Sequence, residues 1–264
     1  MIDHGANRKN LGKPSLPAAF RSSARTHAGA SRETNQDAFL SRNDLGLWAV
    51  ADGMGGHASG EVASRMLTEG METINAESDL GRMGAQVQAK IQETHDVMTQ
   101  CASDDDALNA MGSTIVVLLG GRDKIECIWA GDSRIYRYRE GRMTQLTRDH
   151  SLVQQMIDSG ALDEETARNH PQRNVITRAV GAQSSLALDS RSDSLASGDK
   201  YLLCTDGLYN MLSDDELCKL ISAGPINEAA DLLMATALAR GADDNVTLIL
   251  VEVVNDGKAQ RNEP

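Results

Sequence analysis

The sequence predicts an α+β fold in which two antiparallel β-sheets pack as a β-sandwich and pairs of antiparallel helices flank it on both sides. Short β-rich runs alternate with pairs of helical runs, in the order strands, two helices, strands, two helices, strand. Glycine and polar residues separate neighbouring β-rich runs, as is typical of antiparallel pairing. Because a helix pair must bury its apolar side on a sheet face, the helices are expected outside two packed sheets.

Three strands are predicted to open the domain, at residues 20–27, 37–41 and 45–51. Residues 61–77 and 80–102 then carry apolar side chains at roughly helical spacing, which predicts a pair of long helices.

The middle of the chain predicts three further strands, at residues 114–119, 124–130 and 134–139. Gly120-Gly121 and Gly131-Asp132 separate them, so an antiparallel meander is expected.

Residues 152–159 and 163–168 predict two short helices that leave the sandwich as an excursion. Strand patterns return at residues 175–177, 186–191 and 200–205.

The last part of the chain predicts two helices and a strand. Ser213 and Glu216 have the spacing of a capping box, so a helix is expected to begin there and to run to about residue 222. A second helix is expected at 226–240 and an apolar strand at 246–254.

The predicted division of the chain is a flexible leader over residues 1–19, one domain over 20–254 and a polar tail over 255–264. At 264 residues the chain is long enough for one large domain with an ample core.

The composition argues against two classes of partner. The formal net charge is −12 and the sequence pI is about 4.9. Nucleic acid and anionic membrane surfaces attract basic proteins, so neither is expected to bind this chain.

The cysteines and the hydropathy pattern predict a cytoplasmic protein. The four cysteines form no CxxC pair, and two of them lie in apolar runs, which is typical of free thiols in a reducing compartment. No apolar run approaches the about 20 residues of a membrane span, and the amino terminus lacks the apolar centre of a signal peptide.

Four aspartates share one local pattern. Asp52, Asp132 and Asp206 each follow an apolar strand and adjoin a glycine, whereas Asp244 precedes a strand and adjoins Asn245. When the stretch around Asp52 is considered alone, an ordinary Asp-Gly turn explains this aspartate as well as a role in ligand binding does. Strand ends can meet at one rim of a sandwich, however, and carboxylates that meet there repel one another unless a cation intervenes.

The residue types favour a hard cation. The ligands would be oxygen atoms without nearby His or Cys, which suits Mg²⁺ or Mn²⁺ and not zinc. Two such ions can activate water and hold the oxygens of a phosphoryl displacement, so phosphoester hydrolysis is the expected reaction. Arg32 is a candidate for bidentate contacts to a phosphate, although a lone arginine is more often a surface residue.

Eight short motifs follow one another along the chain: Arg32-Glu33-Thr34-Asn35-Gln36-Asp37, Asp52-Gly53-Met54-Gly55-Gly56-His57, Gly112-Ser113-Thr114, Gly131-Asp132-Ser133-Arg134, Leu146-Thr147-Arg148-Asp149-His150-Ser151, Ile176-Thr177-Arg178-Ala179-Val180-Gly181, Asp206-Gly207-Leu208 and Asp244-Asn245-Val246-Thr247. In this order they resemble the metal-dependent Ser/Thr protein phosphatases, the type 2C family, in its compact bacterial form. The resemblance covers about residues 20–254.

The resemblance implies a phosphoserine and phosphothreonine phosphatase that uses a hydroxide bridging two Mn²⁺ or Mg²⁺ ions, with room for a third ion. It implies that Asp52 bridges the two ions, that Asp206 and Asp244 complete one of them, and that the carbonyl of Gly53 serves the other. Asp132 would join Asp206 at the third position.

The resemblance also implies the remaining roles. Arg32 would hold the substrate phosphate, and Asp37 would orient metal-bound water, a role whose loss typically costs about 10–100-fold in activity. The excursion at about 152–174 corresponds to the variable flap of the family. The implied partners are phosphorylated proteins and a cognate Ser/Thr kinase, and the implied state is a monomer.

Two positions depart from the pattern of the eukaryotic members. Met54 stands in place of the histidine usually assigned as general acid, so the group that protonates the leaving oxygen is left open, and His57 is a weaker candidate. Gln36 stands where a glutamate linked through water is common.

Two other functions remain alternatives at this point. The fold could serve as an inactive phosphatase that binds a partner, but the usual sign of that class is loss of the metal aspartates, and all four are present. Another two-metal hydrolase, such as a nuclease, would use similar carboxylates but suits neither the acidic composition nor the motif order.

Overall fold

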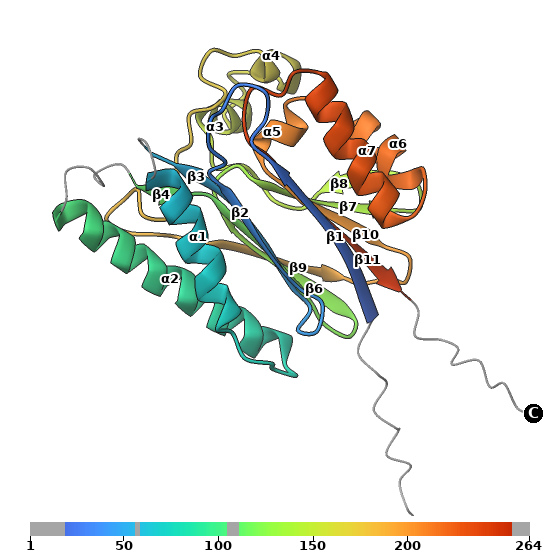
Figure 1. Cartoon of the computed structure of the whole chain (residues 1–264), viewed down its shortest axis with the longest axis horizontal. Helices are drawn as coiled ribbons and strands as arrows, with labels where there is room; N and C mark the ends of the chain where they lie inside the picture. The colour runs from blue at the N-terminus through green and yellow to red at the C-terminus, as the bar shows by residue number, and fades with distance from the viewer. Residues whose placement is uncertain (1–18, 56–58, 105–110, 255–264) are drawn as a thin grey trace, which may run out of the picture.

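The computed structural model describes residues 19–55, 59–104 and 111–254 of the chain. It confirms the predicted fold, because two antiparallel sheets lie face to face and helices cover both outer faces (Figure 1). Residues 1–18 of the predicted leader, the predicted tail and His57 lie outside the described residues.

The first sheet contains five strands in the order β1-β11-β10-β7-β8, and every neighbouring pair is antiparallel. Their bounds are Ala19–His27 for β1, Val246–Val254 for β11, Lys200–Cys204 for β10, Arg134–Arg139 for β7 and Arg142–Gln145 for β8.

The second sheet has the order β2-β3-β5-β6-β9, and the short β4 pairs with the end of β3. The bounds are Asp37–Arg42 for β2, Leu47–Met54 for β3, Ile115–Gly120 for β5, Lys124–Ala130 for β6, Asp189–Ser194 for β9 and Gly112–Ser113 for β4.

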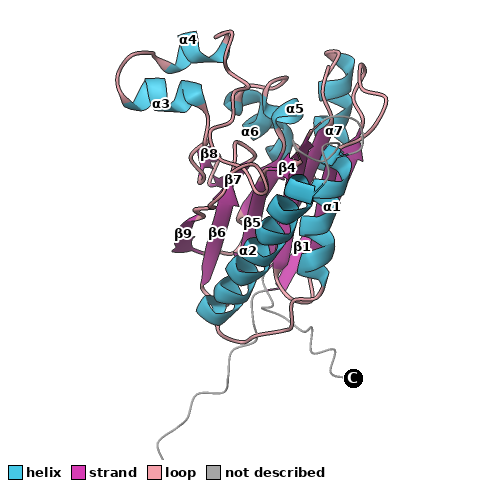
Figure 2. Ribbon diagram, turned by 90° about the vertical axis from the view of Figure 1, so that its left-hand side faces the viewer, coloured by secondary structure: helices cyan, strands magenta, loops and turns pink. Residues whose placement is uncertain are grey.

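One helix pair covers each outer face (Figure 2). Helices α1 (Ser59–Glu72) and α2 (Leu80–Asp104) pack on the second sheet, and α6 (Asp214–Ser222) and α7 (Ile226–Ala239) pack on the first. The capping box at Ser213 and Glu216 is confirmed at the start of α6.

The core has three apolar layers, one between the sheets and one under each helix pair. Trp48, Tyr201 and Ile249 are fully buried between the sheets. Successive side chains of a strand point to opposite faces, so β3, β5 and β11 can be apolar on both faces because each face is covered.

The predicted excursion forms helices α3 (Leu152–Asp158) and α4 (Glu164–Arg168), which stand at one end of the sandwich in Figures 1 and 2. Side chains cap both helices, because Ser151 Oγ accepts from the Gln154 amide and Asp163 Oδ1 from the Thr166 amide.

The predicted meander over residues 114–139 is wrong in its last strand. β5 pairs with β6, but β7 belongs to the other sheet. Gly131 has φ of +111°, which favours glycine, and it turns the chain from one sheet to the other. Asp132 therefore lies at the passage between the sheets.

Three other expectations differ from the structure. The first helix was expected to reach residue 77 but ends at Glu72. Directly after this end, the Thr73 hydroxyl donates to the Gly70 carbonyl. Residues 175–177 form only one isolated bridge, between Ile176 and Ser151. The strand expected at 186–191 is shifted to 189–194, because an edge strand needs no apolar sequence to pair with β6.

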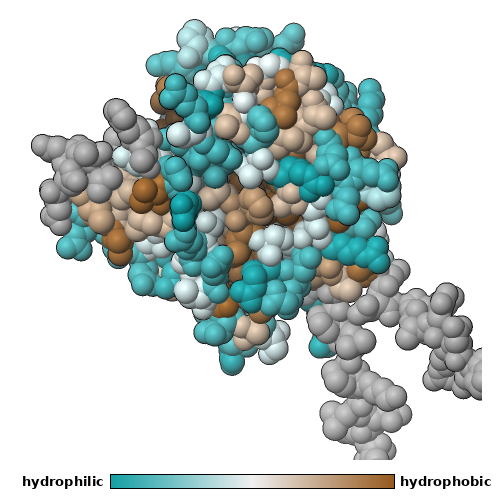
Figure 3. Space-filling model, in the orientation of Figure 1, coloured by the Kyte–Doolittle hydropathy of each residue, from teal (hydrophilic) through white to brown (hydrophobic). Residues whose placement is uncertain are grey.

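The short elements β4, β8 and α5 (Asp206–Tyr209) escaped prediction because two to four residues show no periodicity. No helix within the described ranges is long and apolar enough to cross a membrane. On the face in Figure 3, hydrophobic side chains lie among hydrophilic ones, with a brown area near the centre, where Figure 1 shows β1 and β2.

Candidate active site

Strands β2 and β3 bring two carboxylates together at one end of the sandwich. Asp37 and Asp52 are direct cross-strand partners in the antiparallel register. Like charges directly opposite each other are destabilising. Asp37 Oδ2 accepts a hydrogen bond from the Thr205 hydroxyl at 3.0 Å, whereas its buried Oδ1 has no partner among the described residues.

The ends of β6 and β10 supply two more carboxylates. Asp132 follows β6 in the turn at Gly131, and Asp206 is the first residue of α5, directly after β10. Each has a buried Oδ1 atom without a hydrogen-bond partner in the described part of the chain. Because buried polar atoms normally find a partner, these oxygens indicate that a ligand belongs there.

Asp244 comes from the loop before β11 and is already paired. Its Oδ2 accepts from Arg32 Nη2 at 2.9 Å, and its Oδ1 accepts from the Asn245 amide at 2.8 Å. Arg32 lies on the loop between β1 and β2, so this ion pair joins parts of the chain that are 212 positions apart. The guanidinium thus neutralises one member of the carboxylate group.

The electrostatics of the four remaining carboxylates reflect burial and mutual repulsion. Burial, followed by the charges of Asp206 and Asp244, raises the pKa of Asp37 to about 7, although two threonine hydroxyls oppose the shift. Burial and Asp244 raise the pKa of Asp206 to about 6. The pKa values of Asp52 and Asp132 are also well above the usual range, mainly through burial and then through neighbouring aspartates.

The backbone of Asp52 is fixed by two residues to which the sequence analysis assigned no role, Ser113 and Thr114. The Asp52 amide donates to Thr114 Oγ1 at 3.0 Å, and the Asp52 carbonyl accepts from the Thr114 amide at 2.8 Å and from Ser113 Oγ at 2.9 Å. Thr114 Oγ1 also lies 2.7 Å from Ser133 Oγ, next to Asp132. Their place in the Gly112-Ser113-Thr114 motif was the only sequence signal.

Asn245 is a second residue that sequence reasoning left without a role. Its side-chain amide donates to the carbonyls of Ala28 and Thr34, and its Oδ1 accepts from the Gln36 amide. It therefore fastens both ends of the loop that carries Arg32.

Gly53 lies in a position that no larger residue could occupy. A Cβ atom there would lie 2.0 Å from the carbonyl oxygen of Gly60 and 2.6 Å from that of Gln36. The half-buried side chain of the next residue, Met54, carries no proton to donate.

Asp149, in the Asp149-His150-Ser151 motif, takes part in a chain of contacts that supports the scaffold. Arg134 donates to both oxygens of Asp149 at 2.7–3.0 Å, and its guanidinium lies 3.7 Å from the centre of the Tyr209 ring. Tyr209 donates to the carbonyl of Asp132 at 3.0 Å. This chain of contacts braces the Asp132 turn.

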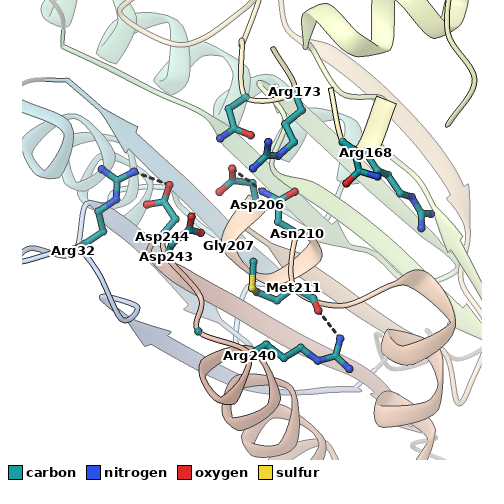
Figure 4. A pocket seen from close by; sticks show the side chains of 13 residues that line it. Arg32, Arg168, Arg173, Asp206, Gly207, Asn210, Met211, Arg240, Asp243 and Asp244 are labelled. Carbon is teal, nitrogen blue, oxygen red and sulfur yellow. Dashed lines mark hydrogen bonds and ion pairs between the residues drawn. The ribbon is translucent and has the colours of Figure 1, made fainter. Parts of the chain in front are cut away.

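A cavity of about 430 Å³ is lined by Asp206 and Asp244 of the carboxylate group. Figure 4 shows Arg32 and Asp244 on one side and Arg173 beside Asp206 on the other. Asp243, in the loop before β11, also lines this cavity. A second cavity, of about 530 Å³, continues under α3 and α4 and reaches Asp132.

Comparison with known proteins gives matches over most of the chain. The family model for protein phosphatase 2C matches residues 25–240. The serine/threonine phosphatase stp of Listeria innocua is 34% identical over 86% of this chain and 94% of its own length. The structure of PppA, a regulatory component of the type VI secretion system of Pseudomonas aeruginosa, is 35% identical with a TM-score of 0.83, over 90% of this chain and 99% of that one.

The serine/threonine protein phosphatase PstP of Mycobacterium tuberculosis is 34% identical over 89% of this chain. This chain spans 45% of the length of PstP. A structure of the PstP catalytic domain in complex with two manganese ions has a TM-score of 0.81 and 31% identity, over 89% of this chain and 99% of that one.

The family match covers the strands and loops that carry Asp37, Asp52, Asp132 and Asp206. Together with the fold and the related proteins, it confirms the resemblance drawn from the eight sequence motifs. The chain belongs to the protein phosphatase 2C family.

Proposed function

We propose that this chain is a Ser/Thr protein phosphatase that hydrolyses phosphoserine and phosphothreonine in proteins with two bound Mn²⁺ or Mg²⁺ ions and room for a third. The observation that supports it best is the set of three buried carboxylate oxygens without partners, on Asp37, Asp132 and Asp206. They lie at the rim of a phosphatase 2C fold, where Asp206 lines a cavity of about 430 Å³ and Asp132 and Asp206 line the cavity that continues from it.

The chemistry of these residues fits the proposed ions. Hard divalent cations prefer oxygen ligands, and the site offers carboxylates and the Gly53 carbonyl. In the described ranges, no group of three or more His, Cys, Asp or Glu side chains is arranged closely enough to hold a metal ion. Repulsion keeps uncompensated carboxylates apart, so the aspartates are expected to turn inward when ions bind.

Asp52, Asp206 and Asp244 are the proposed carboxylate ligands, the Gly53 carbonyl is a further one, and Asp132 would serve the third position together with Asp206. Bound ions would supply Lewis-acid polarisation and an activated water at neutral pH. Asp244, which binds Arg32 in this structure, would hold an ion instead. The Arg32 guanidinium would then be available for the substrate phosphate, which we propose it holds.

Asp37 is the proposed proton-accepting and water-orienting residue, and two observations support this role. Thr205 fixes one of its oxygens, and the other remains available. Its pKa of about 7 before ions bind reflects burial near other aspartates, and cations nearby would lower that pKa.

We further propose that residues 20–254, together with Ala19 at the start of β1, form the catalytic domain, with residues 152–174 as a flap beside the site, a leader before Ala19 and a tail at 255–264. The proposed setting is the cytoplasm, with a Ser/Thr kinase as the opposing enzyme and a monomer as the active form. The acidic composition supports the expected absence of nucleic-acid and membrane partners.

The test combines phosphate release with direct measurement of metal binding. Wild-type protein with Mn²⁺ should release phosphate from a phosphothreonine peptide, and chelation should stop the release. Asp206→Asn should abolish the release and weaken Mn²⁺ binding in calorimetry. Asp215→Asn, an exposed change on α6, is the matched control. No release by the wild type from a broad panel of phosphopeptides would refute the proposal.

A further inference from the structure

The flap carries two arginines whose charge is not compensated. Arg168, at the end of α4, and Arg173, in the loop that follows, are both exposed. Neither forms an ion pair or a side-chain hydrogen bond with any residue that the structure describes. Glu164 precedes Arg168 by four residues, a spacing that favours pairing on a helix, yet the two do not pair.

Other exposed arginines of the described residues, such as Arg82, also have no ion pair, but they line neither cavity, whereas Arg168 and Arg173 line both, in a chain of net charge −12. Several other arginines near the rim hold carboxylates: Arg32 binds Asp244, Arg134 binds Asp149 and Arg178 binds Asp189. With acidic side chains abundant, a guanidinium without a partner beside a cavity is available for an anion from outside the chain.

Both arginines line both cavities, so they lie where the space over the carboxylates meets the space under the flap. In Figure 4, Arg173 lies beside Asp206, while Arg168 extends away from it along the wall. Arg32 lies on the opposite side of Asp206 and Asp244. The two flap arginines therefore extend from the carboxylates outward, along a path that the residues flanking a phosphorylated side chain would follow.

The loop does not depend on these guanidinium groups for its shape. Its turns are closed by backbone hydrogen bonds, from the Arg173 amide to the His170 carbonyl and from the Val175 amide to the Gln172 carbonyl. Asp163 caps α4 at its start. Substitution of either arginine side chain should therefore leave the flap folded.

We propose that Arg168 and Arg173 form a subsite for carboxylate side chains that flank the phosphorylated residue, so that the enzyme prefers acidic phosphopeptides. This inference rests on the proposed phosphatase function. An acidic protein repels acidic peptides in general, so a preference for them would require a local cationic site. Hydrogen bonds between charged partners are stronger than neutral ones.

The test compares two phosphothreonine peptides that differ only in charge, one with Glu and one with Gln at the three positions on each side. For the wild type, kcat/KM for the Glu peptide should exceed that for the Gln peptide by about tenfold, as expected for one or two charge-assisted hydrogen bonds. In the Arg168→Gln/Arg173→Gln double variant this ratio should fall to near one.

Arg82→Gln is the matched control, because Arg82 is exposed on α2 and lines neither cavity. It should keep the wild-type ratio. A wild-type ratio near one, a ratio unchanged in the double variant, or an equal fall in the Arg82→Gln variant would each overturn the inference.

Mn²⁺-dependent hydrolysis of p-nitrophenyl phosphate separates this inference from the function on which it rests, because that compound has no flanking residues. If the wild type hydrolyses it but shows no preference between the peptides, only the subsite is refuted. If the wild type hydrolyses neither it nor the peptides, the proposed function itself fails.

Discussion

At the scale of single residues, the site depends on hydroxyl groups as much as on carboxylates. Thr114 Oγ1 accepts from the Asp52 amide and lies 2.7 Å from Ser133 Oγ, so one hydroxyl connects the strand of Asp52 with the turn of Asp132. Gly131 packs directly on Thr114, because a Cβ atom there would lie 2.6 Å from Thr114 Cβ. The relative position of two proposed ligands thus depends on a residue that is not itself a proposed ligand.

Thr114→Val should weaken Mn²⁺ binding by about 10-fold or more, in the range found for residues that orient metal ligands. Loss of the buried partner of the Asp52 amide should also lower the free energy of unfolding by about 1–3 kcal/mol. Thr114→Ser, which keeps the hydroxyl, should restore the affinity. Calorimetric titration with Mn²⁺ and urea unfolding measure the two effects.

The control for this prediction is Thr94→Val. The buried Thr94 on α2 donates only to the Lys90 carbonyl one turn earlier. If the Thr114→Val and Thr94→Val variants bind Mn²⁺ equally well, Thr114 does not position the ligands.

At the scale of elements, the loop between β1 and β2 brings Arg32 to the site without any regular structure of its own. The anchor is Asn245, which is 5% exposed and binds this loop at Ala28, Thr34 and Gln36. Because Asn245 directly follows Asp244, one dipeptide holds both a proposed metal ligand and the loop of the phosphate-binding arginine.

Asn245→Ala should release this loop, because three backbone groups lose their partner. We expect faster amide hydrogen exchange across residues 28–36, a higher KM for phosphopeptides and a loss of about 1–3 kcal/mol of stability for the polar groups left unsatisfied. Asn227→Ala, at an exposed position on α7, is the control. Unchanged exchange in residues 28–36 despite a lower global stability would show that Asn245 supports only the core.

At the scale of the whole molecule, the sandwich keeps several acidic groups buried at one rim, and this opposes folding when no cation is present. The pKa of Asp37 rises from 3.8 to about 7 and that of Asp206 to about 6 in the folded protein. The folded state therefore keeps protons that the unfolded state has already lost. That contribution to stability is complete below pH 4 and disappears as the pH rises through about 6 and 7.

The metal-free protein should consequently lose stability between pH 5 and pH 8, by an amount on the order of a few kcal/mol. Mn²⁺ should reduce or reverse this loss, because ions bind the deprotonated carboxylates and stabilise only the folded state. Denaturant unfolding at several pH values, with chelator or with Mn²⁺, measures both curves.

The Asp206→Asn variant gives an internal check on this pH dependence. It removes one of the carboxyl groups whose pKa is raised. Without metal, the variant should therefore be more stable than the wild type at pH 8, and its free energy of unfolding should fall less steeply with pH. If the wild-type protein gained stability from pH 5 to pH 8 in the presence of chelator, the raised pKa values of Asp37 and Asp206 would be contradicted.

The sequence by itself determined the succession of strands and helices, because periodicity and capping act over a few residues. It also placed Asp52, Asp132 and Asp206 at strand ends, since an apolar run followed by an aspartate is visible without any tertiary information. The order of the motifs was enough to predict the family.

Only the tertiary structure decided which strands share a sheet and which polar groups meet. β7 joins β10 and not β6 because Gly131 turns the chain across the sandwich, and no local pattern shows where a turn delivers the next strand. The pairing of Arg32 with Asp244 and the link from Asp52 through Thr114 to Ser133 join distant parts of the chain. Such contacts depend on strand register and packing, which act over the whole domain and leave no trace in a short window of sequence.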